Sequence, residues 1–174
     1  MILHEHKTIF VHINKTGGSS IEQAMIGEHA IPEKHYNVRD YLRRYPAEFK
    51  NYFKFTFIRN PWDKVVSQYF FQKKVKNLKV SFEQFVYKPT GRVFQNQLDW
   101  ITLNGEMAVD FVGRFENLQT DFDIVCNKIG HDRLWLPHIH KSNRRHYSQY
   151  YNKETRDYIG RLYSQDVEYF GYKF

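Results

Sequence analysis

The chain of 174 residues contains a single cysteine, Cys126, so it can form neither an internal disulfide nor a cysteine-based metal site. It also lacks internal repeats, linkers, low-complexity tracts and any zinc-finger or RNP pattern. An apolar strand pattern starts at Thr8, which leaves no room before it for a signal peptide or a membrane anchor. We therefore expect a cytoplasmic protein with no integral membrane segment and no nucleic-acid partner.

Aromatic residues and positive charge are abundant instead. Phe, Trp and Tyr make up 18% of the chain, which favours a packed globule over disorder. Lys and Arg number 26 against 19 Asp and Glu, a net charge of +7 that favours anionic ligands. The length fits one domain, residues 1–174, that is large enough to bury a core.

The most informative segment is a short apolar run over residues 8–13 that breaks into a polar loop and then into a helical pattern. The loop reads Lys15-Thr16-Gly17-Gly18-Ser19-Ser20. Its glycines let successive N–H groups point at one anion, the helix N-terminus adds its dipole, and the lysine and hydroxyls add donors. The segment predicts a phosphate-binding loop, although the lysine precedes the glycines, the reverse of the order in nucleotide triphosphatases.

A second motif follows the alternating apolar pattern of residues 53–58. Arg59 comes first, Asn60 can cap a helix, Pro61 suits the first helical position, and Ser67 follows later in that helix. A guanidinium fork matches the geometry of a phosphate dianion. The second motif therefore predicts another phosphate contact.

Together the two motifs resemble those of the PAPS-dependent sulfotransferases. The resemblance is to the carbohydrate branch, which is related to heparan sulfate 2-O-sulfotransferase and the HNK-1-type enzymes, and it covers most of the chain. The first motif is similar to that family's P-K-T-G-G-[ST]-S loop, with Asn14 in place of the proline. The second is similar to R-N-P-[WF]-[DE]-[RK]-x-x-S, and residues 112–118 and 166–174 also resemble family signatures.

The resemblance implies a role for each motif. The loop from Lys15 to Ser20 would bind the 5'-phosphosulfate of PAPS, and Arg59 and Ser67 would bind its 3'-phosphate. A late loop containing Lys141, Ser142, Arg144 and Arg145 would close over the nucleotide. Lys15 would also be catalytic, because charge develops on the departing 5'-phosphate oxygen. A sulfuryl group carries less negative charge than a phosphoryl group, so we expect no metal.

The general base is the least determined of these assignments. His35 lies between the two phosphate motifs, where related carbohydrate sulfotransferases place a catalytic histidine, and an imidazole titrates near neutral pH. His12 falls inside the first strand pattern and is interpreted as a core histidine or a support of the site. His140, His138 and Glu116 are the alternatives to His35. A metal pair formed by His138 and His140 is disfavoured, because no carboxylate or thiolate accompanies them.

The order of patterns predicts an α/β fold: a P-loop-type domain with a central parallel sheet and helices on both faces. Strands are expected over residues 8–13, 53–58 and 109–115. Helices are expected over residues 20–26, 38–45, 94–103 and 152–170, after Pro61, from Ser81 to Val86, and around Cys126. The lysine-rich run over residues 73–79 is expected to lie in a loop that could face an anionic acceptor.

The sequence thus predicts a sulfotransferase that moves a sulfuryl group from PAPS to an acceptor hydroxyl and releases PAP. The acceptor is expected to be a saccharide, which could be anionic. Two alternatives remain at this stage. One is a noncatalytic protein that binds PAP or an acidic glycan, and the other is a P-loop small-molecule kinase that uses ATP and Mg²⁺. The reversed loop order and the lack of an acidic strand end near a phosphate motif disfavour the kinase.

Overall fold

The structure is a computed structural model that describes residues 1–27, 35–137, 139 and 144–174. The chain divides into two compact units. The first comprises Met1–Ile58 and Gln97–Ile139 and contains the main sheet, so it is called the sheet unit. The second comprises Arg59–Asn96 and His140–Phe174 and is called the helical unit. Each is described by itself.

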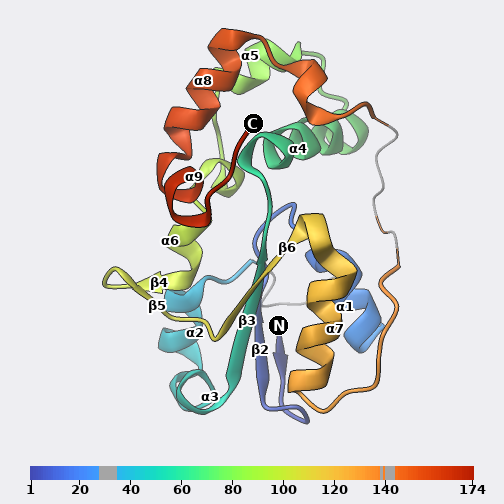
Figure 1. The fold of residues 1–174 in the computed structure, drawn as a ribbon, viewed down its shortest axis with the longest axis vertical. Helices are drawn as coiled ribbons and strands as arrows, with labels where there is room; N and C mark the ends of the chain where they lie inside the picture. The colour runs from blue at the N-terminus through green and yellow to red at the C-terminus, as the bar shows by residue number, and fades with distance from the viewer. Residues whose placement is uncertain (28–34, 138, 140–143) are drawn as a thin grey trace. The chain divides into compact units, whose positions relative to one another are not determined.

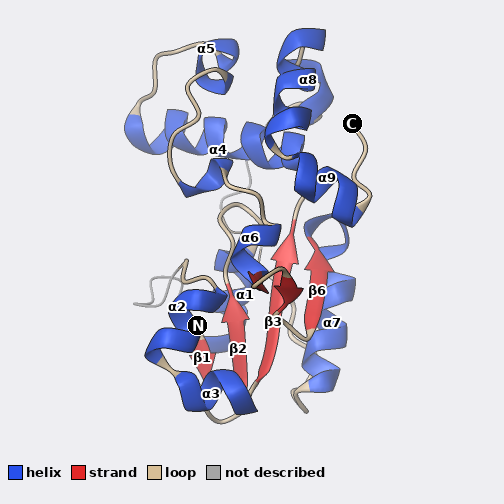
Figure 2. Ribbon diagram, turned by 90° about the vertical axis from the view of Figure 1, so that its left-hand side faces the viewer, coloured by secondary structure: helices blue, strands red, loops and turns tan. Residues whose placement is uncertain are grey.

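The sheet unit is built on a four-stranded sheet with the order β1-β2-β3-β6 (Figure 2). Its strands are β1 (Ile2–Leu3), β2 (Thr8–Val11), β3 (Phe53–Ile58) and β6 (Phe111–Arg114). β2, β3 and β6 run parallel, whereas the short edge strand β1 is antiparallel to β2. The strand β4 (Thr102–Leu103) pairs with β5 (Glu106–Met107) in a separate two-stranded ribbon.

Helices cover both sides of this sheet. The two helices α2 (Val38–Arg44) and α3 (Pro46–Asn51) lie on one side, and α1 (Gly18–Ile26) and α7 (Leu118–Lys128) lie on the other (Figure 1). A short helix, α6 (Leu98–Ile101), precedes β4. The core beneath α1 and α7 includes the aromatic residues Phe10, Phe55, Phe57 and Phe122. Cys126 is buried in the same core, as predicted.

The helical unit forms around α4 (Pro61–Lys76). It also contains α5 (Phe82–Val86), α8 (Lys153–Leu162), α9 (Ser164–Phe170) and two 3₁₀ turns at Arg92–Phe94 and Tyr147–Tyr150. Asn60 caps α4 by accepting hydrogen bonds from the N–H groups of Trp62 and Asp63, and its amide donates to the Lys173 carbonyl at 2.9 Å. The chain's last residues are thereby fixed against the start of α4, where the ring of Phe174 meets that of Trp62.

Most of the predicted elements are confirmed. The mixed α/β architecture, the mostly parallel sheet and its surrounding helices are as expected. The Asn60 cap with Pro61 at the start of α4 and the Ser81–Gln84 capping box of α5 are both present. α1 ends at Gly27, whose left-handed φ of 69° closes the helix as predicted.

Three local predictions are wrong. The lysines at positions 73, 74 and 76 belong to the last turn of α4, because nothing breaks that helix before Asn77 adopts a left-handed φ of 50°. The expected helix over residues 94–103 is reduced to α6, with a 3₁₀ turn before it and a strand after it. The expected terminal helix is two helices that meet at Tyr163, whose buried hydroxyl donates to the Val93 carbonyl.

Among the residues described, none of the helices combines the length and the hydrophobicity needed to cross a membrane.

Candidate functional site

The first predicted motif begins where β2 ends and connects directly to α1. β2 is completely buried between its neighbours, so its carboxyl end is fixed. The helix cap, Gly17, carries no side chain that could accept the N–H groups of the first turn of α1. The Ser20 N–H donates to the Gly17 carbonyl at 3.0 Å, and the positive end of the helix dipole at this point favours an anion. This strand–loop–helix arrangement is the one that the sequence predicts for the first motif.

Both loop glycines are required by their surroundings. A Cβ at Gly18 would overlap the imidazole ring of His12, so the loop backbone lies directly against that ring. A Cβ at Gly17 would come 2.7 Å from a methyl group of Leu118, and Gly17 also has a left-handed φ of 89°. Only glycine fits at these two positions, so the loop backbone packs directly against His12 and Leu118.

The loop hydroxyls have different tasks. Thr16 is buried and donates its hydroxyl to the Ile13 carbonyl at 2.8 Å, so this side chain braces the loop. Ser20 is also buried, and its hydroxyl accepts a hydrogen bond from the Ile139 N–H at 3.4 Å. Asn14, which stands where the family motif has proline, buries its side-chain oxygen with no hydrogen-bond partner in the described part of the chain. Ser19 remains partly accessible beside them.

A buried acid–imidazole pair lies beneath the loop. His12 follows β2 directly, and its Nδ1 is 2.6 Å from Oε1 of Glu22 on α1. The side chains of His12 and Glu22 are 3% and 0% exposed, respectively. The His12 ring also stacks on Phe10 at a centroid distance of 5.5 Å. The expectation that His12 would lie in the core is confirmed, and the pairing with Glu22 was not foreseen, because no local pattern links residues ten positions apart.

His35 is held beside this pair in the sheet unit. Its Nδ1 lies 3.2 Å from the backbone carbonyl of His12, and the two imidazole centroids are 4.6 Å apart. A carbonyl can only accept, so Nδ1 carries the proton in this contact and Nε2 carries the lone pair. His35 therefore lies next to His12, the residue between β2 and the loop. Its tautomer leaves Nε2 unprotonated, as a base acting through that atom requires.

The second motif starts directly after β3, the strand parallel to β2, and belongs to the helical unit. The Nε and Nη2 atoms of Arg59 lie 2.9 and 2.8 Å from Oδ2 of Asp63, one turn along α4. Arg144 pairs with the other oxygen, Oδ1, of the same carboxylate. One acid thus holds two guanidinium groups, an arrangement with a net positive charge. Ser67 is half-buried one further turn along α4.

Asp63 was not among the predicted site residues, and Arg144 was predicted only as a member of the late loop. Asp63 could have been found from the motif itself, because an acid four residues after Arg59 on a helix is placed to pair with it. The pairing of Arg144 with Asp63 could not, since 81 residues separate the two. Lys141 and Ser142, which the resemblance assigns to the nucleotide, lie outside the described residues, as do His138 and His140.

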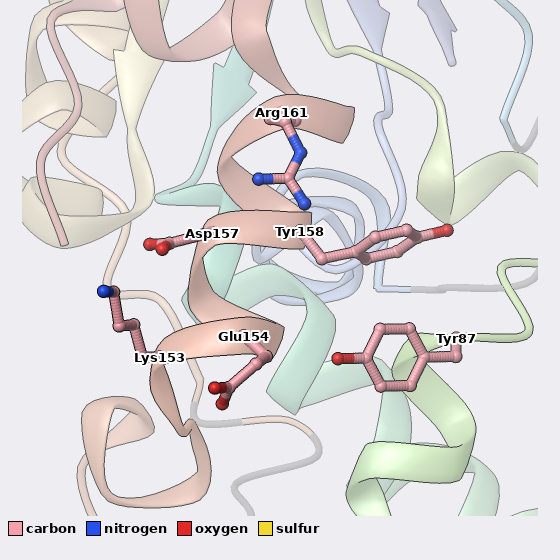
Figure 3. Close-up of a pocket in the computed structure, with 6 residues that line it drawn as sticks. All are labelled: Tyr87, Lys153, Glu154, Asp157, Tyr158 and Arg161. Atoms are coloured by element: carbon pink, nitrogen blue, oxygen red, sulfur yellow. The ribbon is translucent and has the colours of Figure 1, made fainter.

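A further pocket of about 280 Å³ lies on α8 in the helical unit (Figure 3). Tyr87 follows α5, and the other lining residues, which come from α8, are Lys153, Glu154, Asp157, Tyr158 and Arg161. The rings of Tyr87 and Tyr158 meet edge to face at a centroid distance of 5.2 Å. None of the predicted nucleotide-site residues lines this pocket.

The fold is that of an α/β protein in which the first motif connects β2 to α1. The chain matches the Sulfotransferase family over residues 1–173, and it belongs to that family. It is also similar to an uncharacterized protein of Archaeoglobus fulgidus, with 41% identity over 86 residues that cover 47% of this chain and 71% of the relative. No solved structure matches it significantly. The family supports sulfuryl transfer to an acceptor as the general activity.

Proposed function

We propose that the protein transfers a sulfuryl group from PAPS to a hydroxyl group of a saccharide and releases PAP. The observation that carries the proposal is the loop after β2, where Gly17 and Gly18 pack too closely against Leu118 and His12 for any side chain, and where α1 begins without a side-chain cap. Membership of the Sulfotransferase family supports it. PAPS, when bound, supplies the sulfuryl group, whose bond to the 5'-phosphate oxygen breaks as its bond to the acceptor oxygen forms.

Lys15 is proposed to stabilise the negative charge that develops on the departing oxygen. It precedes the glycines and has a left-handed φ of 67°, a backbone state that is uncommon for residues other than glycine. Strained residues of this kind concentrate at functional sites. The loop N–H groups share the charge, and Thr16 keeps the loop in shape through its bond to Ile13.

Arg59 is proposed to bind the 3'-phosphate together with Ser67. Asp63 holds the guanidinium of Arg59 from one side and so restricts its rotation, and a preoriented fork loses less conformational entropy on binding. Arg144, bound to the same carboxylate, adds the positive charge that a dianion requires. Lys141 and Ser142 are assigned to the nucleotide by family resemblance.

His35 is proposed to accept the proton of the attacking hydroxyl on Nε2. Its Nδ1–H donates to the His12 carbonyl, which orients the ring and leaves the lone pair on the opposite nitrogen. The proton leaves the acceptor oxygen as that oxygen bonds to sulfur. His35 then returns the proton to solvent.

Transfer of labelled sulfate from PAPS to a panel of soluble glycans tests the proposal directly. Calorimetry with PAP and AMP tests the nucleotide assignment. PAP should bind at least about a hundredfold more tightly, because losing charge-assisted bonds to a phosphate costs a few kcal/mol. Equal affinities would contradict the 3'-phosphate assignment.

The alternatives give different outcomes in the same assays. PAP binding without turnover on any hydroxyl acceptor would identify a noncatalytic binding protein. Tighter binding of ATP than of PAP, with phosphorylated products, would identify a kinase. Activity should persist in EDTA, because the transferred sulfuryl group carries less negative charge than a phosphoryl group, and a strict requirement for Mg²⁺ would contradict the mechanism.

A further inference from the structure

The His12–Glu22 pair is almost completely buried beneath the loop. Glu22 is completely buried and His12 is 3% exposed. Burying a charge costs free energy unless the charge is paired and hydrogen-bonded. The protonation state of His12 therefore depends on that of Glu22, and the reverse. With Glu22 ionised and His12 neutral, the pair carries a charge of −1. With His12 protonated, it is neutral overall.

The position of the ring makes this charge matter for ligand binding. Nδ1 of His12 faces Glu22, and the opposite edge of the ring, Cδ2 and Nε2, lies where a Cβ of Gly18 would be. Nε2 is therefore in contact with the backbone of the loop that the proposed function assigns to the 5'-phosphate. Two titratable groups contact the ring, Glu22 from α1 and His35, and Lys15 lies in the loop above it.

We propose that the His12–Glu22 pair takes up a proton as the nucleotide binds, so that His12 becomes a cationic part of the 5'-phosphate site. The proton comes from solvent and is added to Nε2, while Nδ1–H remains donated to the ionised Glu22. This inference rests on the proposed function. A negative pair beneath the loop opposes an anion, and protonation removes that repulsion and adds a positive edge.

Proton uptake and nucleotide affinity are linked. If one proton is taken up on binding, affinity for PAP rises up to about tenfold for each unit that the pH falls within the range where His12 titrates. Glu22 acts as a positioning residue: its carboxylate fixes the Nδ1–H tautomer and compensates the imidazolium. A purely structural pair would leave the pH dependence of binding unchanged.

The test is calorimetry of PAP binding in buffers of different ionisation enthalpy near pH 7, which counts the protons exchanged. The wild-type protein should take up as much as one proton more than the His12→Asn variant. The ionisation of PAP itself is common to both proteins and cancels in the difference. His4→Ala, at an exposed histidine outside the loop, is the control and should retain the uptake. Glu22→Gln should reduce the uptake, because it removes the carboxylate that compensates the imidazolium.

A measurement on the wild-type protein covers the case in which the variants do not fold. Nitrogen-15 spectra of labelled histidine should identify His12 by the low-field proton that its Nδ1–H shares with Glu22. Addition of PAP near pH 7 should move both ring nitrogens to imidazolium positions. An unchanged neutral ring, or equal proton uptake in wild type and His12→Asn, would overturn the inference while leaving the nucleotide site intact. Failure of wild type to bind PAP at all would instead contradict the proposed function.

Discussion

Lys15 and His35 share an uncommon backbone state, with left-handed φ angles of 67° and 66°. Lys7, in the turn between β1 and β2, has a comparable φ of 46° and an exposed side chain. It therefore offers a control in which the same residue type is changed in a similar backbone state. Alanine keeps the Cβ of lysine, so the steric cost of the left-handed backbone is the same in each variant as in the wild-type protein.

Lys15→Ala is expected to reduce turnover far more than it weakens PAP binding. The lysine acts most strongly on charge that develops only as the leaving oxygen departs, so its loss raises the barrier more than it destabilises the bound state. Removal of one such donor typically costs about a hundredfold to a thousandfold in kcat. Steady-state kinetics with PAP calorimetry measure both quantities, and Lys7→Ala should match wild type. A loss confined to PAP affinity would assign Lys15 to binding alone.

His35→Ala tests the proposed base. PAP binding and the melting temperature should be retained, while turnover falls by roughly a hundredfold or more, the usual contribution of a positioned proton acceptor. Activity of the wild-type enzyme should rise through a histidine titration, and the variant should lack that limb of the pH profile. His4→Ala, at an exposed surface histidine, is the control. Turnover within a few-fold of wild type would place the base elsewhere, and early melting would make His35 structural.

At the scale of elements, the outcome of each sequence prediction follows from where the determining contacts lie. β2, α1 and the start of α4 were predictable, because apolar runs, Gly27, Asn60 and Pro61 are local signals. The break at Tyr163 depends on its hydrogen bond to Val93, 70 residues away, which no periodicity can reveal. The same distinction applies to the site, where the loop was evident and the Asp63–Arg144 and His12–Glu22 pairs were not.

α4 also contains a buried cation that gives the fold a pH dependence. Lys64 is completely buried, with its amine 5.1 Å from the centre of the Tyr163 ring. Burial lowers the pKa of Lys64 from 10.5 to about 8, although the charge of Asp166 opposes this shift. Between these two values the unfolded state binds more protons than the folded state, so the free energy of unfolding rises with pH across that window.

Urea unfolding from pH 7 to about 9.5 should reveal this slope. The contribution of Lys64 to stability should grow by about 2 kcal/mol between pH 8 and 9.5. Lys64→Met should lose that gain, and Lys74→Met, at an exposed position of the same helix, should keep it. The measurement compares the slopes of unfolding free energy against pH. It does not compare absolute stabilities, because the loss of Lys64 also changes the environment of the buried Asp166. Parallel slopes in all three proteins would show that Lys64 does not titrate in this range.

Two buried tyrosines have the opposite effect at higher pH. Burial raises the pKa values of Tyr151 and Tyr163, so the unfolded state loses these protons first and the free energy of unfolding falls as the pH rises further.

At the scale of the whole molecule, the family match runs through both compact units. Each unit is discontinuous in sequence: the chain passes between them after Ile58, after Asn96 and after Ile139. β3 also continues through Arg59 and Asn60 directly into α4, without a linker. A unit assembled from two separate segments cannot complete its core until both are in place, so unfolding of one unit releases constraints on the other.

We therefore predict that residues 1–174 unfold as a single cooperative domain. Scanning calorimetry should give one transition, with calorimetric and van't Hoff enthalpies in agreement. PAP at about a hundred times its dissociation constant should add roughly 2.7 kcal/mol of stability and raise the midpoint of the whole transition by about 5–10 °C for a chain of this size. AMP at the same concentration should raise it less, because it lacks the 3'-phosphate assigned to Arg59. Two transitions, only one of which moves with PAP, would show instead that the units fold independently and that the nucleotide is bound by one of them.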